Sequence, residues 1–303
     1  MDLKGAGDSM KVKCVATICA LGGTAWAGHA GATTIYGDYG PASGEHLITF
    51  DSASPATLTS NIPLTGLVSN DGVDELAFQP STGQLYGLGS DHLYTINTTT
   101  GAATSVGTLS QLFSSQAGFN FNPVTGLIHV LVTNAEFIMN PANGAITPDG
   151  TVAFAAGDPN AGKTPSISGL AYSNNFAGAT STTMYDLNIS NELATLTTEN
   201  PSNSTLTTIG SGAGSFGGTP VGFAISPTGS AFAALQLNLS DEGNTRLYSV
   251  NLATGGLTEI DTIGGESNFL NVASIAVPVP EPASLITIGL GIMGLLIRRR
   301  PVA

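Results

Sequence analysis

A short pattern, in which two apolar segments flank a turn that contains Pro and Gly, recurs along this 303-residue chain. Pro presets the backbone of the turn and Gly takes its left-handed position, so each copy predicts two antiparallel strands. The copies are FQPSTGQLYGL (residues 78–88), FNPVTGLIHVL (121–131) and ISPTGSAFAAL (225–235). Residues 33–278 show no long helical periodicity, and this favours an all-β fold.

A second pattern follows each copy, and it adds two more strands. An apolar segment runs to an Asn, a turn with Gly follows, and a Thr-rich strand comes after it. The copies are LYTINTTTGAATSVG (93–107), FIMNPANGAITPDG (137–150), MYDLN (184–188) and LYSVNLATGGLTEI (247–260). Tyr94, Tyr185 and Tyr248 fall at equivalent places in this pattern, so we expect them to be structural.

The spacing of these four-strand units predicts a β-propeller. The first strands fall near Leu76, Phe119, Leu170 and Phe223, at intervals of 43, 51 and 53 residues, and propeller blades repeat at about 40–50 residues. Residues 271–278 resemble a first strand without partners, and residues 46–66 resemble a third and fourth strand. Joining the two would close a ring of five four-stranded blades. A sixth blade, or an open β-structure, is the alternative.

The start of the chain has the order of a secretory signal peptide, which we predict over residues 1–32 as a signal helix. Two lysines follow Met10, an alternative start, and an uncharged apolar run covers residues 15–25. Small residues at the cleavage positions then predict cleavage after Ala32, with Ala27 as the alternative. The body is therefore expected outside the cytoplasm.

The charge of the body limits its partners. Residues 32–277 hold 18 Asp and Glu residues against Lys163 and Arg246, a net charge of −16. Such a surface repels phosphate backbones, so nucleic acid is not an expected partner. It would attract divalent cations or basic surfaces, although we favour a role in solubility.

The end of the chain combines three features. Pro280, Glu281 and Pro282 keep the backbone extended. The uncharged segment 283–297 would span about 22 Å as a helix at ~1.5 Å per residue, a short transmembrane helix beside a hydrocarbon core of about 30 Å. Arg298, Arg299 and Arg300 follow and would hold the tail on the cytoplasmic side. A plain single-pass anchor is the alternative to a processing signal.

These features together resemble the PEP-CTERM sorting signal of Gram-negative bacteria, over residues 279–303. The resemblance implies that exosortase recognises the tail and cleaves near Pro280, Glu281 and Pro282. It also implies export by the secretion machinery, transient attachment to the inner membrane, and delivery to the cell surface or extracellular matrix. Proteins with this signal are associated with exopolysaccharide and biofilm.

The body resembles a bacterial domain-of-unknown-function family that is common in exported proteins and expected to be propeller-like. The resemblance rests on LAFQPSTGQLYGLGSDHLYTINTTTGAATSVG (76–107), FNFNPVTGLIHVL (119–131), LAYSNN (170–175) and LYSVNLATG (247–255), and it covers roughly residues 46–265. The family carries no assigned catalytic residues, so the resemblance transfers none.

The residues themselves indicate little catalytic chemistry. Both cysteines lie in the first 20 residues, so the body has no cysteine for a disulfide or a nucleophile. His46, His92 and His129 are isolated in sequence, and we expect His129 to be a packed core residue. The carboxylate oxygens of Asp71, Asp74 and Glu75 are ligands that suit Ca²⁺. The alternative is that these three residues are solvated loop carboxylates that bind no metal. We expect no other cofactor.

We therefore expect a non-enzymatic cell-surface or matrix protein that interacts with exopolysaccharide or with other surface proteins. One alternative is a hydrolase or lyase that acts on polysaccharide at the mouth of the propeller, which convergent Asp, Glu or His side chains would favour. A Ca²⁺-dependent adhesin is the other alternative.

Overall fold

The computed structural model describes residues 32–280, apart from 41–43, 70, 114–116, 191–192, 211–217, 238–243 and 268–269. The predicted signal helix and transmembrane helix lie outside these residues, as do Glu281, Pro282 and the three terminal arginines. Within the described part of the chain, no helix is long and apolar enough to cross a membrane.

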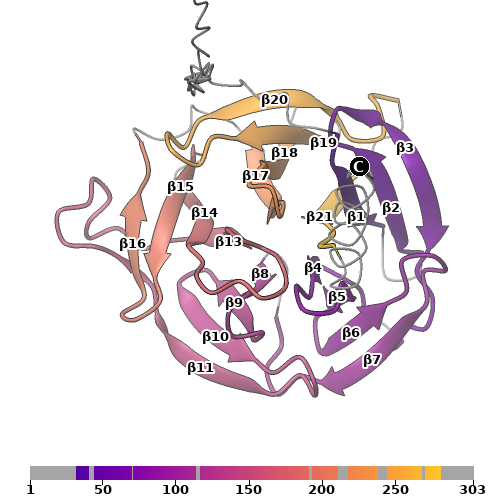
Figure 1. Cartoon of the computed structure of the whole chain (residues 1–303), viewed down its shortest axis with the longest axis horizontal. Helices are drawn as coiled ribbons and strands as arrows, with labels where there is room; N and C mark the ends of the chain where they lie inside the picture. The colour runs from indigo at the N-terminus through magenta and orange to yellow at the C-terminus, as the bar shows by residue number, and fades with distance from the viewer. Residues whose placement is uncertain are drawn as a thin grey trace, which may run out of the picture. The chain divides into compact units, whose positions relative to one another are not determined.

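The strands form five sheets arranged as the blades of a propeller (Figure 1). From the inside outward, blade 1 consists of β21 (Val272–Ala276), β1 (Thr34–Tyr39), β2 (His46–Asp51) and β3 (Ser54–Pro63). Blade 2 consists of β4 (Glu75–Phe78), β5 (Leu85–Leu88), β6 (His92–Ile96) and β7 (Ala103–Thr108). Blade 3 consists of β8 (Gly118–Phe121), β9 (Ile128–Val132), β10 (Ala135–Met139) and β11 (Ile146–Thr151).

Blade 4 has a fifth strand at its outer edge. It consists of β13 (Ile167–Tyr172), β14 (Met184–Ser190), β15 (Leu193–Asn200), β16 (Thr205–Thr208) and β12 (Ala153–Phe154), and β12 pairs with β16 in parallel. Blade 5 consists of β17 (Gly218–Ile225), β18 (Ala231–Leu237), β19 (Thr245–Val250) and β20 (Leu257–Thr262). The predicted all-β propeller with five blades is confirmed, with this one extra strand.

The innermost strands β4, β8, β13, β17 and β21 contact one another in that order and close a ring. Glycines allow their close approach. A Cβ atom on Gly169 would lie 2.9 Å from the Cβ of Phe223, and one on Gly222 would lie 2.6 Å from the backbone nitrogen of Ile275. The inner strands therefore pack backbone against backbone where blades 4, 5 and 1 meet.

The ring closes as the sequence predicts. Strand β21 near the C-terminus is the innermost strand of blade 1 and pairs with β1, with Tyr36 opposite Ala276 and Gly37 opposite Ile275. Residues 46–66 contain the third and fourth strands of the same blade. Strand β1, the second strand, has no counterpart in the predicted pattern.

The Asn residues that end third strands act as predicted. The side-chain oxygens of Asn97, Asn140 and Asn251 each accept a hydrogen bond from the backbone N–H two residues later. The Gly four residues after each Asn has a positive φ of 70–73°, which a Gly adopts without the strain of a Cβ. The repeated pattern therefore has a direct physical basis in these turns.

One assignment in the repeat is wrong. MYDLN (184–188) lies in β14, the second strand of blade 4, so Tyr185 is not equivalent to Tyr94 and Tyr248, which lie in the third strands β6 and β19. The third strand of blade 4 is β15, which ends at Asn200, and this Asn accepts the turn hydrogen bond from the N–H of Ser202. MYDLN was therefore assigned to the third strand although it lies in the second. The β13–β14 loop lacks the Pro-Gly turn that marks the first hairpin in the other copies.

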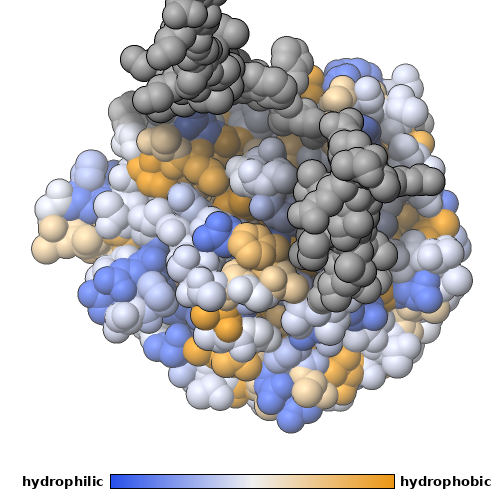
Figure 2. Space-filling model, viewed as in Figure 1, coloured by the Kyte–Doolittle hydropathy of each residue, from blue (hydrophilic) through white to orange (hydrophobic). Residues whose placement is uncertain are grey.

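The core lies between adjacent blades. Leu131 and Val152 of blade 3, for example, pack with Leu170 and Met184 of blade 4. Burial of this apolar surface stabilises the contact of one blade with the next. On the face shown in Figure 2, hydrophobic residues lie in several separate groups among polar residues.

Candidate functional site

The three predicted metal ligands lie close together in sequence but face different neighbours. Asp71 and Asp74 belong to the loop before β4, and Glu75 is the first residue of β4. Asp71 and Glu75 are buried and Asp74 is half-buried.

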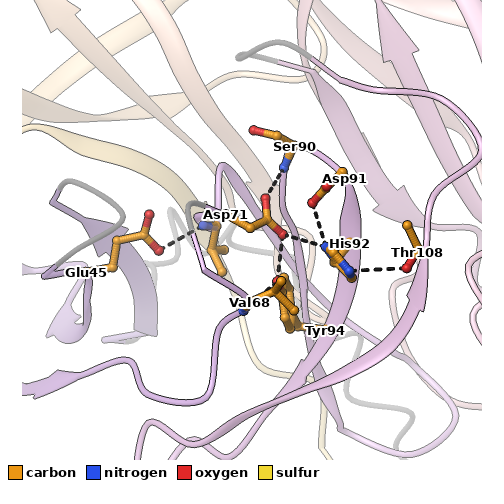
Figure 3. Close-up of polar contacts among 9 residues, drawn as sticks. Glu45, Val68, Asp71, Ser90, Asp91, His92, Tyr94 and Thr108 are labelled. Carbon is orange, nitrogen blue, oxygen red and sulfur yellow. Dashed lines mark hydrogen bonds and ion pairs between the residues drawn. The ribbon is translucent and has the colours of Figure 1, made fainter.

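Asp71 anchors its loop to blade 2 (Figure 3). The hydroxyl of Tyr94 donates a hydrogen bond to Asp71 Oδ2 at 2.6 Å, and the backbone N–H of Ser90 donates to Oδ1 at 2.8 Å. The Tyr94 oxygen in turn accepts a hydrogen bond from the N–H of Val68. Tyr94, expected to be structural, thus fixes the loop through the carboxylate of Asp71.

His92 lies between two carboxylates in the same network (Figure 3). Its Nδ1 is 2.5 Å from Asp91 Oδ1 and 3.3 Å from Asp71 Oδ2, and its Nε2 is 3.2 Å from Thr108 Oγ1. One ligand atom from each of Asp71, Asp91 and His92 lies within 4.8 Å of the others. The structure therefore brings Asp71 together with Asp91 and His92, which the sequence had not grouped.

Glu75 joins three blades at the ring. Its Oε1 accepts a hydrogen bond from the N–H of Ala117, which precedes blade 3, at 3.1 Å. Its Oε2 accepts one from Ser274 Oγ of β21, also at 3.1 Å. Burial raises the pKa of Glu75 well above its usual value, against the effect of these bonds. Glu75 is thus a buried link between blades.

Two further carboxylates approach from blade 1. Glu45 Oε2 accepts a hydrogen bond from the N–H of Val73 at 2.8 Å. Asp38 of β1 is 1% exposed, and its Oδ1 has no hydrogen-bond partner. Burial, with the charges of Glu45 and Asp74, raises the pKa of Asp38. We call Asp38, Glu45, Asp71, Asp74 and Glu75 the acidic cluster.

The acidic cluster predicts that stability falls as the pH rises. Burial, together with the charges of Asp74 and Asp71, raises the pKa of Glu45 to about 7, although the hydrogen bond from Val73 acts to lower it. Between pH 4.5 and about 7 the folded protein holds a proton that the unfolded chain has released, so the free energy of unfolding decreases with pH.

Urea unfolding at pH 5 and pH 8, with a chelator present, measures this dependence. We expect a lower free energy of unfolding at pH 8, and we expect Glu45→Gln to reduce the difference because Gln stays neutral while still accepting the Val73 hydrogen bond. A stability that rises over this range would contradict the burial of protonated carboxyls.

The residues of the acidic cluster offer the oxygen ligands that Ca²⁺ prefers. Asp71 and Glu75, however, already accept hydrogen bonds from different elements. The calcium hypothesis therefore stays a prediction.

The sequence of the body matches a known family. The profile of the family described as Domain of unknown function (DUF4394) matches residues 46–276. The chain belongs to the DUF4394 family. This assignment brings no catalytic residues with it, and no curated protein matches the chain.

A second profile, the PEP-CTERM protein-sorting motif, matches residues 278–300. The predicted sorting signal is confirmed, and it implies processing by exosortase and export to the surface or the extracellular space. This DUF4394 protein is thus an exosortase-sorted, exported propeller.

Several solved structures resemble this DUF4394 chain. A chain of the Nidogen/Laminin complex shares 11% identity, with 83% of this chain and 100% of that chain covered and a TM-score of 0.48. TolB from Acinetobacter baumannii shares 12% identity, with 82% and 67% covered and a TM-score of 0.47. The Dos1 propeller shares 14%, with 70% and 53% covered and a TM-score of 0.38.

The chain spans about half the length of the Dos1 propeller chain, and 26% of a BT4673 extracellular-domain chain from B. thetaiotaomicron. These likenesses carry no assignment of function to the DUF4394 chain.

Proposed function

We propose that the mature propeller is a non-enzymatic interaction protein that binds exopolysaccharide at the surface of a Gram-negative cell. One observation carries the proposal. A hollow of about 310 Å³ lies at the end of blade 2, between the β4–β5 and β6–β7 turns. Its lining is Thr82, Gly83, Gln84, Leu85, Ile96, Asn97, Thr98 and Thr99.

The chemistry of the hollow suits a neutral, hydroxyl-rich ligand. Its lining is dominated by hydroxyl and amide groups and contains no charged side chain. Hydroxyls both donate and accept hydrogen bonds, as sugar hydroxyls do. The strongly negative body disfavours an anionic polymer, so a neutral polysaccharide is the better fit. The sorting signal supplies the surface location, and attachment to the inner membrane precedes release.

A turn of blade 5 provides a test that preserves the fold. The turn Asn97-Thr98-Thr99-Thr100-Gly101 corresponds to Asn251-Leu252-Ala253-Thr254-Gly255, and both Asn side chains accept the same two backbone hydrogen bonds. The double substitution T98L/T99A therefore gives blade 2 the turn of blade 5 without changing the backbone.

We expect T98L/T99A to weaken binding to purified exopolysaccharide from the host by about tenfold, the effect of losing about 1.4 kcal/mol of hydrogen bonding, with an unchanged melting temperature. Leu252 packs against the core of blade 5, whereas Ala253 is exposed, so Ala253→Thr is the control and should leave binding intact. Isothermal titration calorimetry measures both. Wild-type protein that does not bind, or equal binding by T98L/T99A, would remove the support for this hollow.

A further inference from the structure

A group of buried carboxylates lies between blades 3 and 4, away from the acidic cluster. Asp186 of β14 and Glu199 of β15 are 0% and 5% exposed, and within the described residues neither carboxylate accepts a hydrogen bond from an N–H or hydroxyl group, while Glu199 lies beside the carboxyl group of Glu136. The side chain of Met184 in β14 packs with Leu131 of blade 3. Asp186 lies two residues after Met184 on the same strand, and Glu199 lies directly opposite Met184 on β15. Since side chains alternate along a strand, both carboxylates point toward blade 3.

Blade 3 presents three ionisable side chains from three adjacent strands. His129 lies on β9, Glu136 on β10 and Asp149 on β11. Glu136 is directly opposite Leu131 of β9, and Leu131 lies two residues after His129. Because side chains alternate along a strand, the side chains of His129 and Glu136 lie on the same face of the sheet. The register shifts so that Glu136 is opposite Gly150 and Phe137 is opposite Pro148, which leaves Asp149 as the extra residue of a β-bulge. Such a bulge redirects its side chain.

The resulting geometry brings three of these side chains close to one another. One ligand atom from each of His129, Glu136 and Asp149 lies within 4.8 Å of the others. His129 Nδ1 is 3.0 Å from Glu136 Oε1, and Ser204 Oγ of blade 4 donates to Glu136 Oε2 at 2.9 Å. His129 and Glu136 are buried, as expected for His129, whereas Asp149 is exposed and leaves access from solvent.

Apart from His129, this group has no partner among the lysines and arginines. Lys163 and Arg246 are the only such residues within 32–280. The Lys163 ammonium donates to Asn160, and Arg246 pairs with Glu259 and Glu266. Ionised carboxylates are costly to bury unless they are paired or bound to a metal.

The pKa values of the carboxyls reflect this imbalance. Burial, with the neighbouring negative charges, raises the pKa of Asp186 and of Glu199. Burial also acts to raise the pKa of Glu136, but hydrogen bonds from His129 and Ser204 hold it below the usual value.

We propose that His129, Glu136 and Asp149 bind a divalent transition-metal cation of the Zn²⁺ type, with Glu199 as a fourth ligand from blade 4. An imidazole combined with carboxylates is a donor set that suits Zn²⁺. The ion links blade 3 to blade 4. The role of the ion is structural, and it is separate from the proposed binding of polysaccharide.

Calorimetric titration of the EDTA-treated, desalted full-length protein with Zn²⁺ tests the proposal. We expect one Zn²⁺ per chain and a melting temperature that rises on binding. Asp149→Asn should weaken Zn²⁺ binding at least about tenfold, since loss of even an outer-shell partner costs 10–100-fold. Asp149 is exposed, so this variant is expected to fold.

Asp261→Asn is the matched control, because Asp261 is also exposed on an outermost strand beside a register shift, in blade 5. It should bind Zn²⁺ like the wild type. Absence of Zn²⁺ binding, or equal binding by the Asp149→Asn variant, would overturn the proposal. An unchanged melting temperature with Zn²⁺ would also overturn it, and would indicate that Asp186 and Glu199 are buried as neutral acids.

Discussion

A chain that ends at Leu270 is expected not to form the propeller, whereas a chain that ends at Pro280 is expected to melt like the full-length protein. The difference is strand β21, which supplies the innermost strand of blade 1 and contacts the neighbouring strands β17 and β4. Its loss exposes the unpaired edge of β1, and it removes Ser274, which bonds both Glu75 and the N–H of Leu76.

The size of the effect follows from burial. Val272, Ile275 and Val277 are at most 4% exposed, and burying each such side chain is worth about 1.5–3 kcal/mol. Together with the lost pairing, this approaches the 5–15 kcal/mol that stabilises a typical domain. Circular dichroism during heating measures the outcome. A cooperative transition of the shorter chain at the full-length temperature would disprove closure by β21.

The substitution Gly222→Val is expected to destabilise the protein by about 3 kcal/mol, the upper range for overpacking a core. A Cβ at Gly222 would lie 2.6 Å from the backbone nitrogen of Ile275 and 2.9 Å from its Cγ1. The first of these atoms belongs to the backbone of β21 and cannot turn aside as a side chain does. Strands β17 and β21 would have to move apart, and this would open the ring of innermost strands.

Gly44→Ala is the control for Gly222→Val. Gly44 is exposed, and no atom lies within 4 Å of the position its Cβ would take. We expect this variant to keep the wild-type urea midpoint. A Gly222→Val variant with the same midpoint would show that the inner strands are not packed backbone against backbone.

The sequence predicted the parts of the fold that depend on local turns. The innermost strands at Leu76, Phe119 and Phe223 can be located because Pro-Gly and Asn-Gly turns separate the strands of blades 2, 3 and 5. Strand β1 was not predicted, since its sequence, TIYGDY, contains neither turn pattern. Blade 4 was misread at MYDLN for the same reason, because its first hairpin has a different turn.

The candidate sites were harder to predict because they depend on register and on contacts between blades. Ser274 bonds Glu75 across 199 positions of sequence, and no local pattern indicates such a contact. His92 seemed isolated, yet the β5–β6 hairpin and the loop before β4 place it beside Asp71. The contact between His129 and Glu136 can in principle be predicted from the sequence. A tight turn after Val132 places the two residues on one hairpin, seven residues apart.

The central claim is that the exported mature protein is the closed ring alone. The predicted processing points lie just outside its closing strands. Cleavage after Ala32 leaves β1, which begins at Thr34, and cleavage near Pro280 leaves β21, which ends at Ala276. Both terminal strands of blade 1 would therefore survive removal of the leader and the tail.

Mass spectrometry of the mature protein from the surface fraction of its host tests this claim most directly. We expect a chain that begins at Thr33 and ends between Pro280 and Pro282. A surface protein that retains Arg298, Arg299 and Arg300, or one that has lost residues of β1 or β21, would contradict it.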